Sequence, residues 1–587
     1  MGKRLRMDRL PYLTPGLGWR GRLAVVAAAT LAPVWGLGGL PAWPDPPSPF
    51  RDNRAAAGIE FRHQRGASGQ KHLVETVGSG CALFDFDNDG WLDILLINGG
   101  LTPDSTASGP VRHALYRNLA NGRFKEVTAK AGMGGNGAFG MGVAVGDYDN
   151  DGDRDVYITN FGPNALYRNN GDGTFSDVTA EAGVGCSDWS TSAAFFDMEN
   201  DGDLDLYVTN YLETSFETNP LCELKKIRTY CYPGHYDGVG DRLYQNLGGG
   251  RFRDVSEAGG ILNPEGKGLG VVAADFDDDG WMDLYVANDT VRNFHYRNNR
   301  QGGFEDMTLL SGTGYNEEAN AEAGMGTDAA DYDGDGLMDI VVTNYDMETN
   351  ALYRNHQDWL FTDERASSGV TRGDRFLLGF GTGFFDFDND GDQDLLVVNG
   401  HVLDNVEQVQ FGFRYAQPDM LLENRQGIFQ EHADFSRESG REPRVGRGSC
   451  FGDLDNDGDL DILVNNCGGS PHLLLNQVGS RKNWILLNLV GSRVNRDAVG
   501  TRIEVTTAAG RQIDQVMGGG GYLGASDLRA HFGLGDADRI QSLRIRWPGG
   551  TEEVYRDLGA NRILSIREGA GKVEVTRVSQ PDGKVER

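Results

Sequence analysis

One nine-residue pattern, D-x-D-x-D-G-x-x-D, occurs seven times in the 587-residue chain and narrows the folds open to it. The copies begin at Asp85, Asp147, Asp197, Asp275, Asp331, Asp386 and Asp453, and we call them loops 1 to 7 in that order. Their spacing averages about sixty residues, which fits one four-stranded propeller blade with its connections. The repeat therefore predicts an all-β fold, a seven-bladed β-propeller.

The segments around each loop have strand character. Loop 2 follows the small-residue run 140-GMGVAVG-146 and precedes the run 155-DVYITN-160. A hairpin comes next, in 165-ALYRNNGDGTFSDVTAEAG-183, where Asn-Gly and Asp-Gly steps join two further strands. Each unit is therefore predicted to hold four strands, with small residues where the inner strands crowd the propeller axis.

The last unit lacks a strand. After loop 7 the segment 472-HLLLNQ-477 supplies a third strand, but no fourth follows it. Residues 57-AGIEFRHQ-64 resemble the ends of the other hairpins, so we expect them to pair with Leu473–Leu475 and close the ring without an exposed edge. The alternative is a plain lead-in segment.

The chemistry of the loops favours a hard cation. Carboxylates at positions 1, 3, 5 and 9 and the carbonyl of position 7 can surround Ca²⁺, and glycine at position 6 allows the sharp turn. An EF-hand would need glutamate at position 12, where loop 1 has Leu96. Magnesium fits less well because it retains its waters. Solvated acidic turns without metal are the alternative reading.

The prediction is up to seven calcium sites, and loop 3 departs from the pattern because Glu199 occupies its position 3. The predicted ligands, with position 7 acting through its carbonyl, are Asp85, Asp87, Asp89, Trp91 and Asp93; Asp147, Asp149, Asp151, Asp153 and Asp155; Asp197, Glu199, Asp201, Asp203 and Asp205; Asp275, Asp277, Asp279, Trp281 and Asp283; Asp331, Asp333, Asp335, Leu337 and Asp339; Asp386, Asp388, Asp390, Asp392 and Asp394; and Asp453, Asp455, Asp457, Asp459 and Asp461.

Charge and the N-terminus bear on partners and location. The formal net charge of -31 argues against nucleic acid as the main partner. Residues 1–42 combine basic residues with the apolar run 23–40, which is typical of a secretory signal or, alternatively, of a membrane anchor. Residues 43–56 form a linker. We expect a secreted, periplasmic or cell-surface protein.

Two resemblances follow from these motifs. Residues 57–477, with their seven acidic loops, resemble the FG-GAP/VCBS repeats of integrin-α-type propellers, and 497–569, with GGGGYL, HFGLG and IRWPGG, resemble an ASPIC/UnbV domain. This order is similar to that of the cartilage acidic protein family. The resemblance implies an extracellular calcium-binding protein involved in adhesion or matrix association, and it supplies no catalytic residues.

The C-terminal region also reads as β structure. Short alternating runs bounded by Gly and Pro predict a small barrel or sandwich over 478–570, followed by a tail over 571–587. From Val478 onward 17 Lys and Arg stand against 13 Asp and Glu, a net charge of +4. This domain could therefore dock against the acidic ring or approach an acidic polymer. For Gly518–Gly521 a packing or turn role is favoured over an anion-binding nest.

Cysteines and aromatic residues mark the longest insertion, 211–238. The spacing of Cys222 and Cys231 suits a disulfide in an exported protein. Tyr230, Tyr232, His235 and Tyr236 make this insertion the best candidate for ligand recognition. Cys81 and Cys450 precede the first and last loops, but their different offsets argue against a bond between them.

The sequence contains no GxSxG, HExxH or CxxC motif, and we find no catalytic constellation. We expect a non-enzymatic, calcium-stabilised scaffold for ligand recognition or adhesion, with a glycan or an extracellular protein as partner. The alternative is an enzyme or assembly accessory factor acting on polysaccharide or a secreted metabolite, since propellers also host catalysis.

Overall fold

The computed structural model describes residues 48–105, 107, 109–432, 434–435, 443–579 and 585–586. The predicted signal or anchor, residues 1–42, and the first five residues of the predicted linker lie outside this part. No helix within the described residues is long and apolar enough to cross a membrane.

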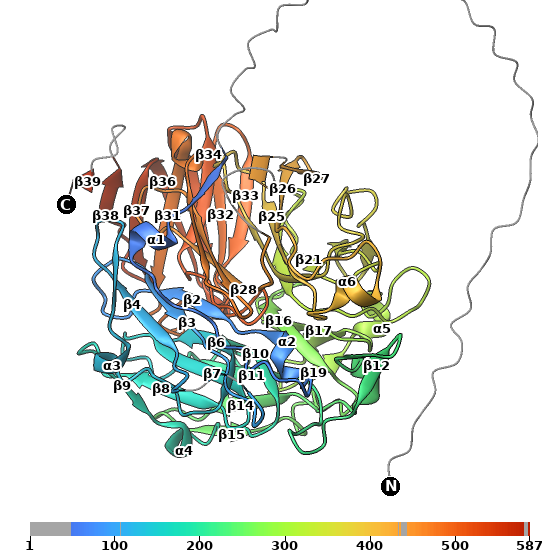
Figure 1. Ribbon diagram of the computed structural model, residues 1–587. Helices are drawn as coiled ribbons and strands as arrows, with labels where there is room; N and C mark the ends of the chain where they lie inside the picture. The colour runs from blue at the N-terminus through green and yellow to red at the C-terminus, as the bar shows by residue number, and fades with distance from the viewer. Residues whose placement is uncertain are drawn as a thin grey trace, which may run out of the picture. The chain divides into compact units, whose positions relative to one another are not determined.

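Strands dominate, and seven four-stranded antiparallel sheets follow one another along the chain (Figure 1). Sheet 1 contains β2 (Cys81–Phe84), β3 (Asp93–Leu96), β4 (Ala114–Asn118) and β5 (Phe124–Glu126); sheet 2 contains β6 (Phe139–Gly146), β7 (Asp155–Phe161), β8 (Ala165–Asn169) and β9 (Phe175–Asp177); sheet 3 contains β10 (Ser190–Phe196), β11 (Asp205–Asn210), β14 (Arg242–Asn246) and β15 (Phe252–Asp254). Sheet 4 contains β16 (Gly268–Ala274), β17 (Asp283–Asn288), β18 (Phe294–Asn298) and β19 (Phe304–Asp306); sheet 5 contains β20 (Thr327–Ala330), β21 (Asp339–Val342), β22 (Ala351–Asn355) and β23 (Phe361–Asp363). Sheet 6 contains β24 (Gly379–Phe385), β25 (Asp394–Asn399), β26 (Met420–Arg425) and β27 (Ile428–Glu431), and sheet 7 contains β28 (Gly446–Gly452), β29 (Asp461–Asn466), β30 (His472–Asn476) and β1 (Phe50–Asp52).

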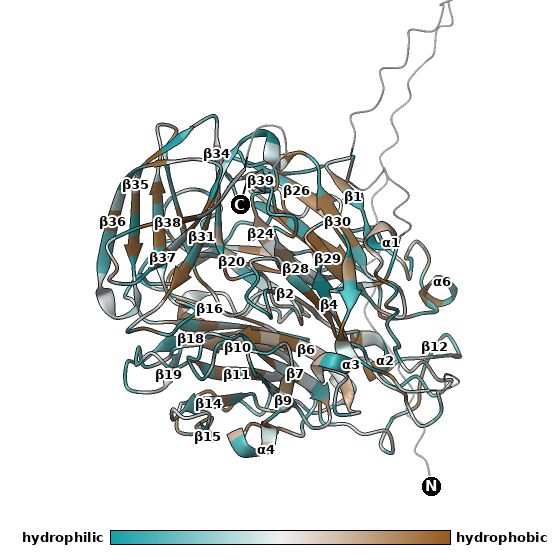
Figure 2. Cartoon of the chain, turned by 90° about the vertical axis from the view of Figure 1, so that its left-hand side faces the viewer, coloured by the Kyte–Doolittle hydropathy of each residue, from teal (hydrophilic) through white to brown (hydrophobic). Residues whose placement is uncertain are grey.

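The α-helices of the described residues are short. They are α1 (Arg54–Ala57), α2 (Val74–Val77), α3 (Thr128–Ala131), α4 (Thr179–Ala182), α5 (Thr308–Ser311) and α6 (Val406–Val409). All four residues of α2 are buried. Figure 2 shows apolar residues concentrated along the strands and hydrophilic residues along the loops.

The first strands of the sheets form a closed cycle. β2 contacts β6, and the contacts continue through β10, β16, β20, β24 and β28 back to β2. Backbones approach so closely here that a Cβ on Gly142 would lie 2.3 Å from the Thr191 carbonyl oxygen, and one on Gly326 would lie 2.1 Å from that of Phe380. The propeller-like arrangement and the small residues at its axis are thus as predicted.

An N-terminal strand does complete the last sheet, as predicted, but it is not the predicted segment 57–64. β1 (Phe50–Asp52) pairs with β30, with Arg51 opposite Leu475, whereas Ala57 ends helix α1. The Ala-Gly step at 57–58 corresponds to the helix that follows the fourth strand in other units, as in Ala182-Gly183. The missing strand therefore lies several residues earlier, inside the predicted linker.

A repeated asparagine at the end of each third strand joins neighbouring sheets. In sheet 2 the Asn169 Nδ2 donates to the Phe86 carbonyl of loop 1 at 2.8 Å and to the Arg154 carbonyl at 3.2 Å. The equivalent residues are Asn118, Asn246, Asn298, Asn355, Asn424 and Asn476, each of which reaches the preceding loop. Asn118 reaches Leu454 of loop 7, so these bonds close the cycle.

The C-terminal domain consists of two sheets. One contains β31 (Asn483–Val490), β34 (Ala530–Gly535), β37 (Arg562–Arg567), β38 (Glu574–Ser579) and β39 (Val585–Glu586), and the other contains β32 (Arg502–Thr506), β33 (Arg511–Gln515), β35 (Arg539–Arg546) and β36 (Glu552–Gly559). β38 pairs with β37 beyond residue 570, where the sequence predicts only a tail.

A glycine-rich segment of this domain, Gly518–Asp527, enters the centre of the ring, and we call it the axial segment. Its Gly521 N–H donates to Thr327 O at 2.6 Å, and its Leu523 and Ala525 carbonyls accept from Val143 and Leu83. Further contacts reach the first strands of the other four sheets, at Phe195, Val271, Thr382 and Phe451. The Tyr522 hydroxyl donates to Val77 O at 3.0 Å, next to helix α2. The packing role predicted for Gly518–Gly521 is confirmed.

Replacing Asn169 with Ala tests the bonds between sheets. The variant leaves two buried carbonyls without donors, so we expect the free energy of unfolding to fall by about 2 kcal/mol. Urea denaturation measures the change, with Asn170→Ala on the exposed turn as the matched control. Equal midpoints for the two variants would contradict the role assigned to Asn169.

Gly518→Ala tests the fit of the axial segment. A Cβ at this position would lie 1.8 Å from the Phe195 carbonyl oxygen, so the backbone must shift. We expect a loss of about 3 kcal/mol in unfolding free energy, measured by urea denaturation. Gly510→Ala, where a Cβ meets nothing within 4 Å, is the control and should be close to neutral.

Candidate metal sites of the acidic loops

Each acidic loop joins the first and second strands of its sheet, and its backbone is shaped by two residues with positive φ. Position 4 adopts the left-handed conformation, as at Asn88 with φ 55° and Asn150 with φ 60°, which asparagine and glycine tolerate well. Position 6 is glycine throughout, as at Gly90 with φ 84°. These two residues turn the chain so that the side chains of positions 1 and 3 approach each other.

The carboxylate at position 1 organises the loop. In loop 1 Asp85 accepts the N–H groups of Asp89 at 3.1 Å and Gly90 at 2.7 Å. The same two bonds occur at Asp147, Asp197, Asp275, Asp386 and Asp453. The loop can therefore fold around this carboxylate before any ion binds.

The carboxylate at position 9 is buried and fixes the loop to the third strand. Asp93 accepts N–H bonds from Phe86 at 3.1 Å and Asn118 at 2.7 Å. Asp155 and its equivalents make the corresponding bonds, and all seven are almost completely inaccessible. Position 9 thus has a structural role in addition to the predicted metal contact.

The structure brings the predicted ligands together. Carboxylate oxygens lie within 4.8 Å of one another in the groups Asp85, Asp87 and Asp93; Asp147, Asp149 and Asp155; Asp275, Asp277 and Asp279; Asp331, Asp333 and Asp339; and Asp386, Asp388 and Asp394. Four of these groups combine positions 1, 3 and 9, and that of loop 4 combines positions 1, 3 and 5. In loops 1 and 2 the position 5 carboxylate accepts the N–H of position 7, as Asp89 does from Trp91 at 3.1 Å.

Position 3 provides an independent indication that a cation belongs here. One carboxylate oxygen of Asp87, Asp149, Glu199, Asp277 and Asp455 is buried without a hydrogen-bond donor, and so is one oxygen of Asp331 at position 1. A buried carboxylate oxygen without a partner is costly, and a hard cation such as Ca²⁺ would satisfy it. The residues present fit calcium in this respect.

Burial also changes the protonation of these groups. It raises the pKa of Asp93 to about 8, that of Asp155 to about 9 and those of Asp147 and Asp197 to about 7. Neighbouring carboxylates of the same loop act in the same direction. At neutral pH such a loop requires either a proton or a metal ion to balance its charge.

Neighbouring loops contact one another. The Asn150 side chain donates to Gly202 O at 2.9 Å and to Asp203, and Asn456 donates to Gly90 O at 3.1 Å. Loop 7 is thereby connected to loop 1 as well as to loop 6, where Asn389 donates to Gly458 O.

The small domain contacts loops 2, 4 and 7. Arg546 lies 3.2 Å from the Asp275 carboxylate of loop 4, and Asp497 accepts both the Asp147 N–H at 2.7 Å and the Arg154 Nε–H at 3.1 Å. At loop 7, Arg529 donates to Asp453 O. The docking of a basic domain on the acidic ring is as the charge distribution predicted.

Arginines that the sequence analysis missed also lie against the loops. Arg117 on β4, Arg297 on β18 and Arg354 on β22 form ion pairs with carboxylates at positions 3 and 5 of their own sheets' loops. The recurring Tyr-Arg-Asn sequence in the hairpins was the signal that could have identified them.

The other end of the ring carries the insertion. Because strands alternate in direction, the connection between the second and third strands lies opposite the acidic loops; we call this the free end. In Figure 1, β12 (Cys222–Leu224) lies at the lower right, away from the orange and red strands of the small domain. The predicted Cys222–Cys231 disulfide is present. Cys81 and Cys450 are unbonded, with their Sγ atoms 3.3 Å apart.

Contacts with the ring hold the insertion in place, and they reduce the number of its residues that could contact a ligand. The Tyr230 hydroxyl donates to Glu75 at 2.8 Å, and Tyr230 and Tyr236 are buried. Tyr232 is 59% exposed and His235 is exposed, so only these two of the four candidate residues face solvent.

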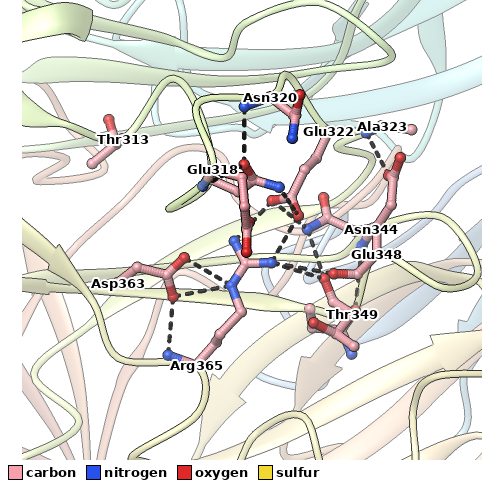
Figure 3. A network of polar contacts seen from close by, with 12 residues as sticks. Thr313, Glu318, Asn320, Glu322, Ala323, Asn344, Glu348, Thr349, Asp363 and Arg365 are labelled. Atoms are coloured by element: carbon pink, nitrogen blue, oxygen red, sulfur yellow. Dashed lines mark hydrogen bonds and ion pairs between the residues drawn. The ribbon is translucent and has the colours of Figure 1, made fainter. Parts of the chain in front are cut away.

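A polar network fixes the free end of sheet 5 (Figure 3). Arg365 donates to Glu322 at 2.9 and 2.8 Å and to Asp363 at 2.8 Å, and Glu348 accepts the Ala323 N–H at 2.8 Å. These bonds hold three loops of this end in one arrangement.

Asparagines at the ends of the second strands fix turns at the free end. Asn160 Nδ2 donates to Pro163 O at 2.7 Å, and Asn210 Nδ2 donates to Gly240 O at 2.9 Å. Such bonds to the following connection show that these side chains stabilise turns.

Family models match two parts of the chain. The FG-GAP-like repeat model matches residues 85–158, 147–208, 234–286, 275–342 and 331–397, and the ASPIC and UnbV model matches 491–573. The second match covers most of the small domain, including the axial segment.

Curated relatives are named cartilage acidic protein 1. The Xenopus tropicalis protein is 26% identical over 531 residues, covering 86% of this chain and 75% of the relative. The Mus musculus protein is 31% identical over 322 residues, covering 51% of this chain and 45% of the relative. The chain thus spans less than half the length of the mouse relative.

Among solved structures, a lectin from Agrocybe aegerita, described as recognising non-reducing terminal N-acetylglucosamine, matches with 16% identity and a TM-score of 0.37, covering 68% of this chain and 96% of the lectin. Family models and curated relatives together agree with the resemblance seen in the sequence. The chain is an FG-GAP-like repeat protein with an ASPIC and UnbV domain, similar over most of its length to cartilage acidic protein 1.

Proposed function

We propose that this protein is an exported, non-enzymatic scaffold whose acidic loops bind calcium and whose free end binds a glycan or an extracellular protein. The observation that carries the calcium part is the set of buried position 3 oxygens without hydrogen-bond donors. In loops 1, 2 and 4 they belong to groups of carboxylates gathered within 4.8 Å of one another, and a divalent cation with oxygen ligands satisfies both features.

The metal has a structural role in this proposal. Loops 2, 4 and 7 lie against the small domain through Asp497, Arg546 and Arg529, so ions held there would brace the ring and its contact with that domain. Calcium would be bound by the folded chain, and its binding free energy would add to folding stability.

The free end is the better candidate for ligand binding. Exposed aromatic side chains gather on its connections: Tyr232 is 59% exposed, Phe376 is 55% exposed, and Phe411 is fully exposed. Fixed loops with exposed aromatic groups suit sugar rings or a protein surface, because such side chains contribute large contact area at low entropic cost.

Export is supported by the disulfide in the insertion and by relatives named for cartilage. The basic and apolar segment at 1–42 agrees with this location.

Calcium should raise the melting temperature of the full chain. Each site saturated a hundredfold above its dissociation constant adds about 2.7 kcal/mol, so the shift should reach several degrees and reverse with a calcium chelator. Magnesium at equal ionic strength should have a smaller effect. Asp455→Asn should reduce the shift, while Asp172→Asn in an exposed hairpin should not. An unchanged melting temperature in calcium would contradict the metal proposal.

Ligand binding should depend on the two exposed residues of the insertion. We expect Tyr232→Ala and His235→Ala to weaken binding to a partner found on a glycan or extracellular-protein array by about tenfold or more. Surface plasmon resonance with calcium present measures the change, and Leu309→Ala on helix α5 is the control. Turnover of a bound polysaccharide would favour the enzyme alternative instead.

A further inference from the structure

One position of each hairpin separates the seven loops into two groups. The fourth residue of the third strand is arginine in sheets 1, 2, 4 and 5, whereas sheets 3, 6 and 7 carry other residues there. In order of sheet they are Arg117, Arg168, Gln245, Arg297, Arg354, Glu423 and Leu475.

In loops 1, 4 and 5 the arginine pairs with the carboxylates at positions 3 and 5. Arg117 lies 2.5 Å from Asp87 and 2.9 Å from Asp89, which are positions 3 and 5 of loop 1. Arg354 repeats this arrangement at loop 5, 2.5 Å from Asp333 and 3.1 Å from Asp335.

Loop 4 shows the same charge at the same place. Arg297 lies 2.8 Å from Asp277 and 3.6 Å from Asp279. In sheet 2 the same position of the third strand carries Arg168, whose side chain is exposed.

The remaining loops have no arginine at this third-strand position, and an arginine of sheet 3, Arg253 on β15, donates to Gln245. At loop 6 Lys482 of the small domain lies 3.8 and 4.0 Å from Asp388 and Asp390, farther than Arg117 and Arg354 lie from their position 3 carboxylates, and the negative charge of Glu423 offsets it. Leu475 brings no charge to loop 7, and Gln245 donates a neutral hydrogen bond to Glu199 in loop 3.

We propose that this third-strand residue sets the calcium affinity of each loop, so that loops 3, 6 and 7 bind calcium tightly and loops 1, 2, 4 and 5 bind it weakly. The inference rests on the proposed calcium function. An arginine already balances positions 3 and 5, and its guanidinium repels a divalent ion a few ångströms away.

The guanidinium also orders the two carboxylates, which favours binding. That effect is smaller, because ordering two short side chains recovers little entropy, whereas the repulsion acts between a single and a double charge at close range. One buried oxygen of Asp87 and one of Asp277 still have no hydrogen-bond donor, so we expect loops 1 and 4 to bind calcium at higher concentration.

Terbium(III), which takes oxygen ligands as calcium does, reports on loop 1 selectively. Trp91 provides position 7 of that loop, and an adjacent indole sensitises terbium emission. The difference between the wild-type protein and Trp91→Phe isolates this signal. Calorimetry gives the concentration at which the tightest sites of the protein fill. We expect the Trp91 signal to reach half-saturation at a terbium concentration about tenfold higher than that.

Arg117→Met should lower that half-saturation concentration about tenfold. Arg117→Lys keeps the charge and should lower it far less, and Lys130→Met removes a charge from helix α3 and should leave it unchanged. At loop 6 the complementary variant Glu423→Arg should remove one site from the tight class in calcium calorimetry, while Glu423→Gln should retain it.

Three results would overturn the proposal. Loop 1 could belong to the tight class already, Arg117→Met could leave its half-saturation unchanged, or Glu423→Arg could leave the number of tight sites unchanged. If the wild-type protein bound neither calcium nor terbium, the calcium function itself would fail, and that outcome differs from binding in a single class unaffected by Arg117 or Glu423.

Discussion

The carboxylates of seven loops meet at one end of the ring, and the balance of their charge governs the structure around them. Backbone N–H groups satisfy the first position, as Gly90 does for Asp85, and arginines such as Arg117 take the third and fifth. The small domain adds Arg546 and Arg529 from above. These groups leave the buried oxygens at position 3 without partners, and we propose that calcium binds those oxygens.

The propeller and the small domain also contact each other at this end of the ring. The axial segment contacts the first strands of all seven sheets, and the glycines that allow this approach leave no space for a side chain at Gly518. The free end carries Tyr232 and Phe376 exposed on its connections, and it is the ligand site that we propose.

Repetition made much of this predictable. From seven acidic loops with strand-like flanks we could predict the four-stranded sheets, the approach of the position 1 and 3 carboxylates, and the small residues at the axis. The Cys222–Cys231 disulfide followed from spacing and compartment. In contrast, the closing strand was misplaced because the Ala-Gly step at 57–58 marks a helix end, and a three-residue strand such as Phe50–Asp52 carries little pattern of its own.

Other features depend on contacts between distant segments. The sequence around Asn169 does not show that its side chain donates to the Phe86 carbonyl of the preceding loop. The sequence around Tyr230 likewise does not show that its hydroxyl donates to Glu75. The axial role of Gly518–Asp527 likewise requires knowing where the small domain docks. The arginines near the loops recur in the sequence, but their ion pairs with the loop carboxylates could be predicted only by knowing which face of the strand they occupy.

A crystal structure of the protein grown in calcium would show whether the loops hold the ion. We expect strong density, with an anomalous signal, about 2.3–2.6 Å from the carboxylate oxygens of positions 1 and 3 and from the position 7 carbonyl, first in loops 3, 6 and 7. Loops that contain only water at millimolar calcium, with the position 3 oxygens still unpartnered, would contradict the metal proposal.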